Sequence, residues 1–167
     1  MTGRDSGAFR SSLALPEHRQ LFDYWQSLGR DNQVPCRSDF DPAGVARLLP
    51  SLFLVDVTTP IADSTIRLAG TKLRETYQRE ITGLRIADFQ LQENGDYWLE
   101  AYRSTVMDRR PVHGVVERRD RAGRLVAQHW LKLPLRHRKP DIDIVICFDI
   151  HIALAERTNA GKIATAS

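Results

Sequence analysis

The stretch that decides the fold is residues 64–83, STIRLAGTKLRETYQREITG. Residues 64–69 alternate with the two-residue period of a half-buried strand. After Gly70, the residues Leu73 and Tyr77 follow the spacing of a helix instead. A short strand that runs over a glycine into a short helix makes a concave corner. Small α+β sensor domains hold ligands at such corners, so this stretch predicts a fold class and a binding site together.

The composition is that of one globular domain. The chain has 167 residues, 42% hydrophobic and 27% charged, which is enough to bury a single core. No apolar run reaches the length of about 20 residues that spans a bilayer, and residues 1–15 read as a flexible tail without a signal peptide. We therefore expect a cytoplasmic protein with no membrane insertion. Cys36 and Cys147 have no partners at ligand spacing, so two free thiols are expected.

Two helices are predicted before the first strand. Pro16 and Glu17 begin the first, because proline suits the first helical position and an acidic residue there complements the helix dipole. Its apolar stripe consists of Leu21, Phe22, Trp25 and Leu28. Asp41 caps the second helix, which ends at Pro50. Residues 16–50 thus form an N-terminal helical extension, whose stripe we expect to pack on a sheet of its own subunit or of a twin.

The remaining elements predict an α+β domain over residues 51–151. Strands at 52–58 and 64–69 form a hairpin, and a longer helix follows the cap residue Asn94. Three more strands are expected in the last third, at 112–119, 124–135 and 142–150. Residues 152–167 are expected to be a C-terminal tail. The order of elements is therefore two strands, short helices, one longer helix and three antiparallel strands.

This order resembles the PAS fold, and several motifs sharpen the resemblance. They are spread over residues 19–150 and are Tyr24-Trp25-x-x-Leu28, Pro35-x-Arg37-x-Asp39-x-Asp41-Pro42, Leu48-Leu49-Pro50, Arg67-Leu68-x-Gly70-Thr71, Thr82-Gly83, Arg109-Arg110-Pro111, Gly123-Arg124 and Leu133-Pro134-Leu135. The chain is thereby similar to bacterial stand-alone PAS domains, a family of single-domain proteins formerly catalogued as a domain of unknown function. The resemblance implies a five-stranded antiparallel sheet with helices on one face. Ile66 and the basic residues 136–139 depart from the family pattern.

The resemblance also implies a cup between the sheet and the helices after its second strand. By that analogy nine residues line the cup and are the expected ligand- or cofactor-binding residues: Leu73, Tyr77, Leu84, Phe89, Trp98, Tyr102, Val115, Leu131 and Ile146. The same residues could instead fill a core, because aromatic residues at helical spacing are more often core than cofactor site. The sequence leaves both readings, and the identity of any ligand, open.

Two cofactors known from PAS domains are disfavoured by the residues present. Haem in well-known oxygen sensors is held by a histidine on the long helix, and residues 94–109 contain none. Photoactive flavin domains need a cysteine in an Asn-Cys-Arg motif on the helical segment, whereas Cys36 and Cys147 fall in a connector and a strand. His113 and His129 could face each other from neighbouring strands, but no metal site is predicted. The cofactor is therefore unknown.

Two other functions are weaker alternatives. For catalysis, no nucleophile stands beside a base, and a small isomerase- or dehydratase-like cone would need a buried pair such as Asp143 and His129. No catalytic residue and no enzyme is therefore predicted. Nucleic-acid binding could use the arginines of residues 118–124 and the basic residues 136–139. Acidic residues are interleaved and no recognition helix is evident, so this reading is disfavoured.

The sequence favours a PAS module that senses or regulates in bacterial signalling by binding. The expected partners are a small molecule in the cup, a signalling protein and a second copy of the chain in a homodimer. With no kinase, cyclase or DNA-binding segment in the sequence, the output is expected to pass through another protein or through self-association. Arg67 is expected to form a surface salt bridge or to contact a ligand or cap. The role of the stretch Arg136, His137, Arg138 and Lys139 is open.

Overall fold

The computed structural model describes residues 3–29, 33–120, 122–137 and 141–155. Its α-helices and strands are α1 (Gly3–Ser12), α2 (Pro16–Leu28), β1 (Leu52–Asp56), β2 (Thr65–Ala69), α3 (Thr71–Tyr77), α4 (Gly95–Met107), β3 (Val112–Arg119), β4 (Leu125–Leu135) and β5 (Ile144–Ala153). Short 3-10 helices lie in the connections: η1 (Arg37–Asp39), η2 (Pro42–Val45), η3 (Leu49–Ser51), η4 (Ile61–Asp63), η5 (Ile86–Asp88) and η6 (Gln90–Gln92). Within the described ranges, every helix is too short or too polar to cross a membrane.

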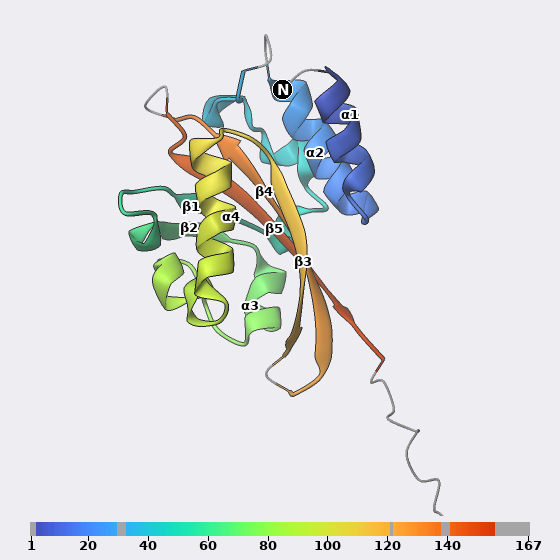
Figure 1. The fold of residues 1–167 in the computed structure, drawn as a ribbon, viewed down its shortest axis with the longest axis vertical. Helices are drawn as coiled ribbons and strands as arrows, with labels where there is room; N and C mark the ends of the chain where they lie inside the picture. Colours follow the sequence, from blue (N-terminus) through green and yellow to red (C-terminus); the bar gives the residue numbers. More distant parts are fainter. Residues whose placement is uncertain (1–2, 30–32, 121, 138–140, 156–167) are drawn as a thin grey trace, which may run out of the picture.

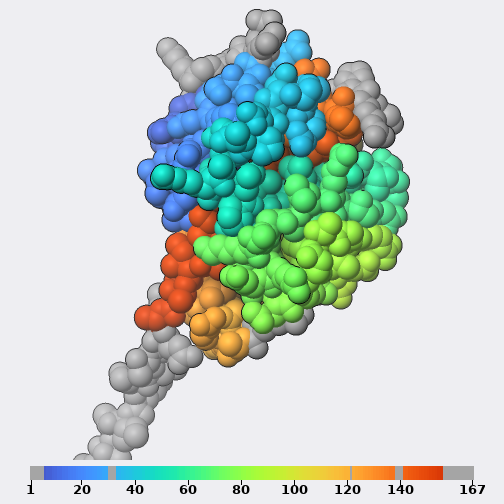
Figure 2. Space-filling view, turned by 180° about the vertical axis from the view of Figure 1, so that it is seen from behind, coloured from blue at the N-terminus to red at the C-terminus, as the bar shows by residue number. Residues whose placement is uncertain are grey.

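The strands form one five-stranded sheet in the order β2-β1-β5-β4-β3 (Figure 1). Every neighbouring pair is antiparallel, so the hairpins β1–β2 and β3–β4 flank the central strand β5. The predicted α+β fold with a five-stranded antiparallel sheet is therefore confirmed. Figure 2 shows the N-terminal part of the chain at one end of the molecule. The tip of the β3–β4 hairpin and the end of β5 project at the other end.

Each face of the sheet is covered by its own helices (Figure 1). We call the face under α3 and α4 the cup face, and the face under α1 and α2 the outer face. On the cup face, the ring of Trp98 lies 5.4 Å from that of Trp130 in β4. On the outer face, the ring of His18 lies 5.3 Å from that of Phe148 in β5. Because side chains alternate along a strand, these contacts assign every residue of β4 and β5 to one face.

The helical extension packs on the sheet of its own chain. Phe22 of α2 is fully buried, and the indole Nε1 of Trp25 donates to the carbonyl oxygen of Pro134 in β4 at 2.8 Å. The ring of Phe9 in α1 lies 4.9 Å from that of Phe22. The flexible tail predicted for residues 1–15 is therefore wrong over α1, because Phe9 gives this polar helix an apolar contact that orders it.

The corner predicted within residues 64–83 is present where β2 turns into α3. Gly70 occupies the N-cap position, and a Cβ atom on it would lie 2.1 Å from the carbonyl oxygen of Leu49. Glycine is needed there because two segments of backbone approach so closely. The Gly70 amide donates to the carbonyl of Leu52 at 2.8 Å, which ties the corner to β1. Thr71 is the first helical residue.

The second predicted helix is two short 3-10 turns, η2 and η3. Asp41 does act as a cap, since its Oδ1 accepts from the Ala43 amide at 2.9 Å. Gly44 disfavours an α-helix in the middle of this stretch, and Pro50 prevents its continuation. Within the described part of residues 16–50, α2 is therefore the one α-helix. It covers the sheet together with α1, which precedes it in the chain.

Two further expectations concern the surface. Arg67 Nη1 lies 3.2 Å from Asp56 Oδ1 across the β1–β2 hairpin, which is the predicted surface salt bridge. Strand β5 continues to Ala153, so the predicted tail begins later than residue 152. Residues 138–140 and 156–167, which include most of that tail and part of the basic stretch, lie outside the described residues.

Candidate functional site

A cavity of about 400 Å³ opens between the β3–β4 hairpin and the segment that runs from the end of α3 to α4. Four residues of its lining are buried, namely Tyr77, Gln90, Trp98 and Gln128. Most of the other lining residues are charged or polar. The cavity therefore joins a buried aromatic and amide-bearing interior to a charged rim.

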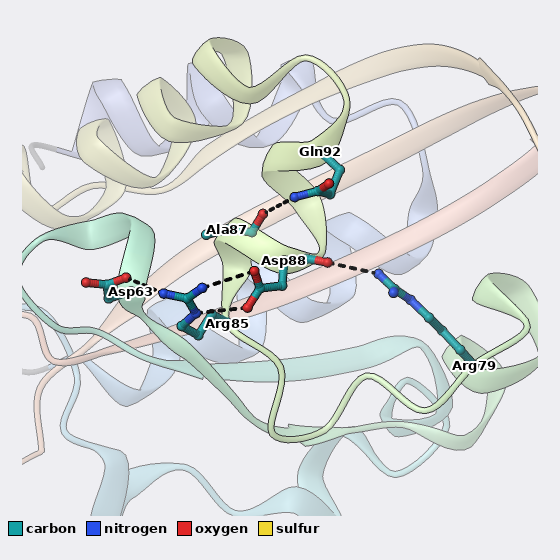
Figure 3. A network of polar contacts seen from close by, with 6 residues as sticks. All are labelled: Asp63, Arg79, Arg85, Ala87, Asp88 and Gln92. Atoms are coloured by element: carbon teal, nitrogen blue, oxygen red, sulfur yellow. Dashed lines mark hydrogen bonds and ion pairs between the residues drawn. The ribbon is translucent and has the colours of Figure 1, made fainter.

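One wall of the cavity is held by a polar network (Figure 3). Arg85 bonds the carboxylate of Asp88 with Nε at 2.8 Å, and its Nη1 lies 3.0 Å from the carboxylate of Asp63. Arg79 donates to the backbone carbonyl of Asp88 at 3.3 Å, and Gln92 donates to a carbonyl of the preceding turn at 2.7 Å. These contacts hold η5 and η6 in place, because 3-10 turns of three residues have few backbone hydrogen bonds of their own.

The interior of the cavity is backed by a buried carboxylate. Asp149 of β5 is 2% exposed, and its Oδ2 accepts hydrogen bonds from Tyr77 Oη and Gln128 Nε2, each at 2.9 Å. Burial, and then the charge of Asp149, raises the pKa of Tyr77 well above its usual range. The phenol therefore remains a donor. Asp149 orients Tyr77 and Gln128, both of which line the cavity.

A second polar group lies around Lys132 of β4. This side chain is fully buried, with Nζ 3.9 Å from the centre of the Tyr102 ring and 3.5 Å from Cys147 Sγ. Tyr102 Oη donates a short hydrogen bond to Gln90 Oε1, and Gln90 lines the cavity. Burial raises the pKa values of Tyr102 and Cys147. A line of contacts thus connects a buried cation with the cavity wall.

Two of these buried side chains have an atom without a hydrogen bond. Gln90 Nε2 and Asp149 Oδ1 find no partner among the described residues. Buried polar atoms are nearly always paired, and leaving one unpaired costs about 1–3 kcal/mol. Gln90 lines the cavity, and its buried amide nitrogen lies behind that lining with its hydrogen-bonding capacity unused.

Six of the nine predicted cup residues lie on the cup side of the sheet. Three line the cavity, namely Tyr77, Phe89 and Trp98. Three pack in or against the core, namely Leu73, Leu84 and Tyr102. The cup is therefore filled by side chains at its centre and open at one end. This arrangement is intermediate between the two alternatives of the sequence analysis, a ligand cup and a filled core. Whether any of these residues binds a ligand stays a prediction.

The other three predicted residues, Val115, Leu131 and Ile146, are on the outer face, which corrects the prediction. Leu131 and Ile146 are fully buried, each next to a residue that faces the cup. Val115 is 50% exposed, whereas its neighbour Val116 lines the cavity. The prediction is one residue out of phase along all three strands. Because helices cover both faces, apolar alternation does not show which face is the cup.

Sequence reasoning missed the polar residues of the cup, namely Gln90, Gln128, Lys132 and Asp149. Three of them lie in strands, where polar residues at alternating positions look like the side of the strand that faces solvent. Trp130 shares the phase of Gln128 and Lys132 in β4. That tryptophan is the signal that could have found them, because a large aromatic residue on a supposedly wet face indicates that the face is covered.

The two histidines that the sequence singled out, His113 and His129, are not part of the cup. His113 Nε2 lies 2.8 Å from Ser12 Oγ of α1, on the outer face. His129 pairs with Ile150, while Asp143 precedes the opposite end of β5. The Asp143–His129 pair that the enzyme alternative would need is therefore not formed. Within the described ranges, no three potential ligands gather closely enough to hold a metal ion.

Comparisons with known proteins agree with this architecture. A family model described as PAS domain matches residues 13–147. An RNA-binding light-oxygen-voltage receptor superposes with a TM-score of 0.51 at 15% identity, over 73% of this chain and 35% of its own. A light-oxygen-voltage domain studied with a flavin analogue gives 0.50 at 15% identity, over 70% and 87%. A light-oxygen-voltage protein of Rhodobacter sphaeroides gives 0.49 at 15% identity, over 65% and 60%.

At such identities the solved structures show a shared fold. The chain spans 60% of the Rhodobacter sphaeroides protein and 35% of the RNA-binding receptor, so it corresponds to part of each. No curated protein matches the chain. The family match, by contrast, covers well over half of the sequence and includes the strands β1 to β4 and helix α4. This chain therefore belongs to the PAS domain family.

Proposed function

We propose that this PAS domain is a sensory signalling module that binds a small molecule in the cavity beside the β3–β4 hairpin. One observation carries the proposal. Gln90 is 6% exposed and lines a cavity of about 400 Å³, and its amide nitrogen has no partner in the described part of the chain. Cavities of this size suit small ligands, and a buried donor favours a ligand that brings an acceptor. Membership of the PAS family supports the sensory role.

The two sides of the cavity suggest how occupancy would become a signal. One side is the segment that carries η5 and η6, and the other is the β3–β4 hairpin. A ligand that touches both would restrain the hairpin against the turns, so binding would lower the freedom of β3 and β4. Strands β4 and β5 carry α2 on their outer face, which offers a route to a partner. The homodimer and the signalling protein predicted from the sequence stay predictions.

A pair of neighbouring valines makes the proposal testable. Val116 lines the cavity, whereas Val115 points away from it on the outer face and is 50% exposed. The purified protein is examined by native mass spectrometry and by thermal shift against a metabolite library. We expect a bound molecule or a stabilising compound with the natural chain and with Val115→Trp, and neither with Val116→Trp, because the indole fills the cavity.

The matched control guards against a general folding defect. Both variants place a tryptophan on β3, so a Val116→Trp protein that melts like Val115→Trp but has lost its ligand supports the cavity. The proposal is overturned if the natural chain retains no molecule and no compound shifts its melting. It is equally overturned if Val116→Trp binds as the natural chain does. An absorption spectrum of the same sample would reveal a coloured cofactor directly.

A further inference from the structure

The rim of the cavity carries more positive charge than its own carboxylates neutralise. Three arginines line it, namely Arg79, Arg118 and Arg119. Two of the three lining carboxylates already bind arginines outside the lining: Asp88 bonds Arg85 at 2.8 Å, and Asp120 bonds Arg124 at 2.7 Å. The third, Glu93, forms no ion pair with any described residue. Three cations thus face one uncommitted carboxylate, which favours an anionic ligand.

The lining arginines are held by rings and backbone. The guanidinium carbon of Arg118 lies 5.7 Å from the centre of the Tyr77 ring, and that of Arg79 lies 5.4 Å from the Phe89 ring. Arg119 donates to a carbonyl of the hairpin turn at 2.6 Å. Over the ranges that the structure describes, none of the three has a carboxylate within ion-pair distance. A guanidinium fixed on a ring face keeps its planar fork of N–H donors for a carboxylate or phosphate.

The interior favours a flat molecule. The rings of Tyr77 and Phe89 meet edge to face with centroids 4.6 Å apart, and both line the cavity together with Trp98. Aromatic walls of this kind pack best against a planar group. Gln90 adds one donor in the buried part, where an oxygen of the ligand would satisfy it. The lining therefore offers aromatic rings on which a planar group can pack, one buried hydrogen-bond donor, and a rim arginine that can pair with an acid.

We infer, on the basis of the proposed function, that the ligand is a small flat carboxylic acid. Its carboxylate pairs with Arg118 at the rim, its ring packs along Tyr77 and Phe89, and a hydroxyl or carbonyl oxygen accepts from Gln90 Nε2. Arg118 is the specificity-determining residue for the acid, because it lies on Tyr77 and leads from the rim to the interior. A neutral amide of the same shape should bind about tenfold more weakly, since it loses a charge-assisted pair.

The test compares an acid with its amide. Titrations of the natural chain with 4-hydroxybenzoate, 4-hydroxybenzamide and phenyl phosphate are followed by NMR or calorimetry. The variant Arg118→Gln should lower the affinity for the acid about tenfold and leave that for the amide nearly unchanged. The control Arg103→Gln removes an exposed arginine of α4 that pairs with Glu100 and does not line the cavity. It should change neither affinity.

Each outcome separates this inference from the proposed function. Preference for the acid that disappears in Arg118→Gln supports it. The inference is overturned if acid and amide bind equally well, if the acid does not bind, or if Arg118→Gln leaves the affinity for the acid unchanged. In each of these cases the proposed function still stands if the protein retains a molecule that Val116→Trp expels. Tighter binding of phenyl phosphate than of the acid overturns the carboxylate in favour of a phosphate. If no molecule is found whose binding Val116→Trp abolishes, the proposed function itself is overturned.

Discussion

The two faces of one sheet differ in chemistry although the same strands build both. On the outer face, β4 and β5 present Leu131 and Phe148, which pack under α2 in a mainly apolar layer. On the cup face the same strands bury Gln128, Lys132 and Asp149 beside a cavity. An apolar layer stabilises a domain, whereas buried polar groups at best offset their own desolvation. We therefore expect the outer face to contribute more to stability, while the cup face is the side on which we propose binding.

The largest expected effect is a break in the outer face. Phe22 is fully buried between α1 and the sheet, so Phe22→Ala should lower the free energy of unfolding by about 3–5 kcal/mol. Urea unfolding monitored by circular dichroism measures it. As the control, Met107→Ala at a position that is 70% exposed should change stability by less than about 0.5 kcal/mol. A loss below about 1 kcal/mol for Phe22→Ala would mean that the outer layer is not a core.

The next effect is the response of the outer face to acid. Burial lowers the pKa of His18 from 6.5 to about 4, and the charges of His129 and His113 act in the same direction. A hydrogen bond with the Phe148 backbone opposes them. His18 is thus neutral in the folded chain but protonates when the chain unfolds below pH 6.5. Its contribution is fully present above that pH and falls by about 3 kcal/mol as the pH approaches 4.

The variant His18→Leu isolates this term. The difference in unfolding free energy between the variant and the natural chain, measured by urea at several pH values, should be constant above pH 6.5 and should shift in favour of the variant below it. Other groups that titrate in this range cancel in the difference. A difference that does not depend on pH would show that His18 is solvated in the folded state. Helix α2 would then cover the sheet less tightly than the contact between the rings of His18 and Phe148 indicates.

The comparison of faces also shows what a single sequence can predict. Element type follows from periodicity, because an alternating strand must bury one phase wherever it lies, whereas the five-stranded antiparallel sheet follows from the resemblance to the PAS fold. The assignment of phase to the cup failed at Val115, Leu131 and Ile146, since both phases of the strands are covered. Helix α1 was missed because its position comes from tertiary contacts such as Phe9 on Phe22 and Arg10 with Asp23, and not from a local pattern. The polar cup residues were missed because burial is a tertiary property.

The smallest expected effect sharpens the comparison most. Lys132 is fully buried and, among the residues described, its cation meets aromatic rings and the Cys147 thiol in place of a carboxylate. Replacement of a buried charge by an apolar side chain of similar volume is often neutral or stabilising. Lys132→Met should therefore change the free energy of unfolding by less than about 1.5 kcal/mol, in either direction. Thermal and urea unfolding measure it, with Lys72→Met at an exposed position of α3 as the control.

A near-neutral result for Lys132→Met has a functional consequence. A lysine that contributes little stability in a fully buried position is explained by the contacts that it makes toward the cavity, through Tyr102 and Gln90. The variant should then weaken ligand binding through a misplaced Gln90 amide, while Phe22→Ala weakens folding and leaves the cup contacts intact. A loss of more than about 3 kcal/mol in Lys132→Met would instead place the ammonium among the stabilising groups. In that case the division of labour between the two faces does not hold.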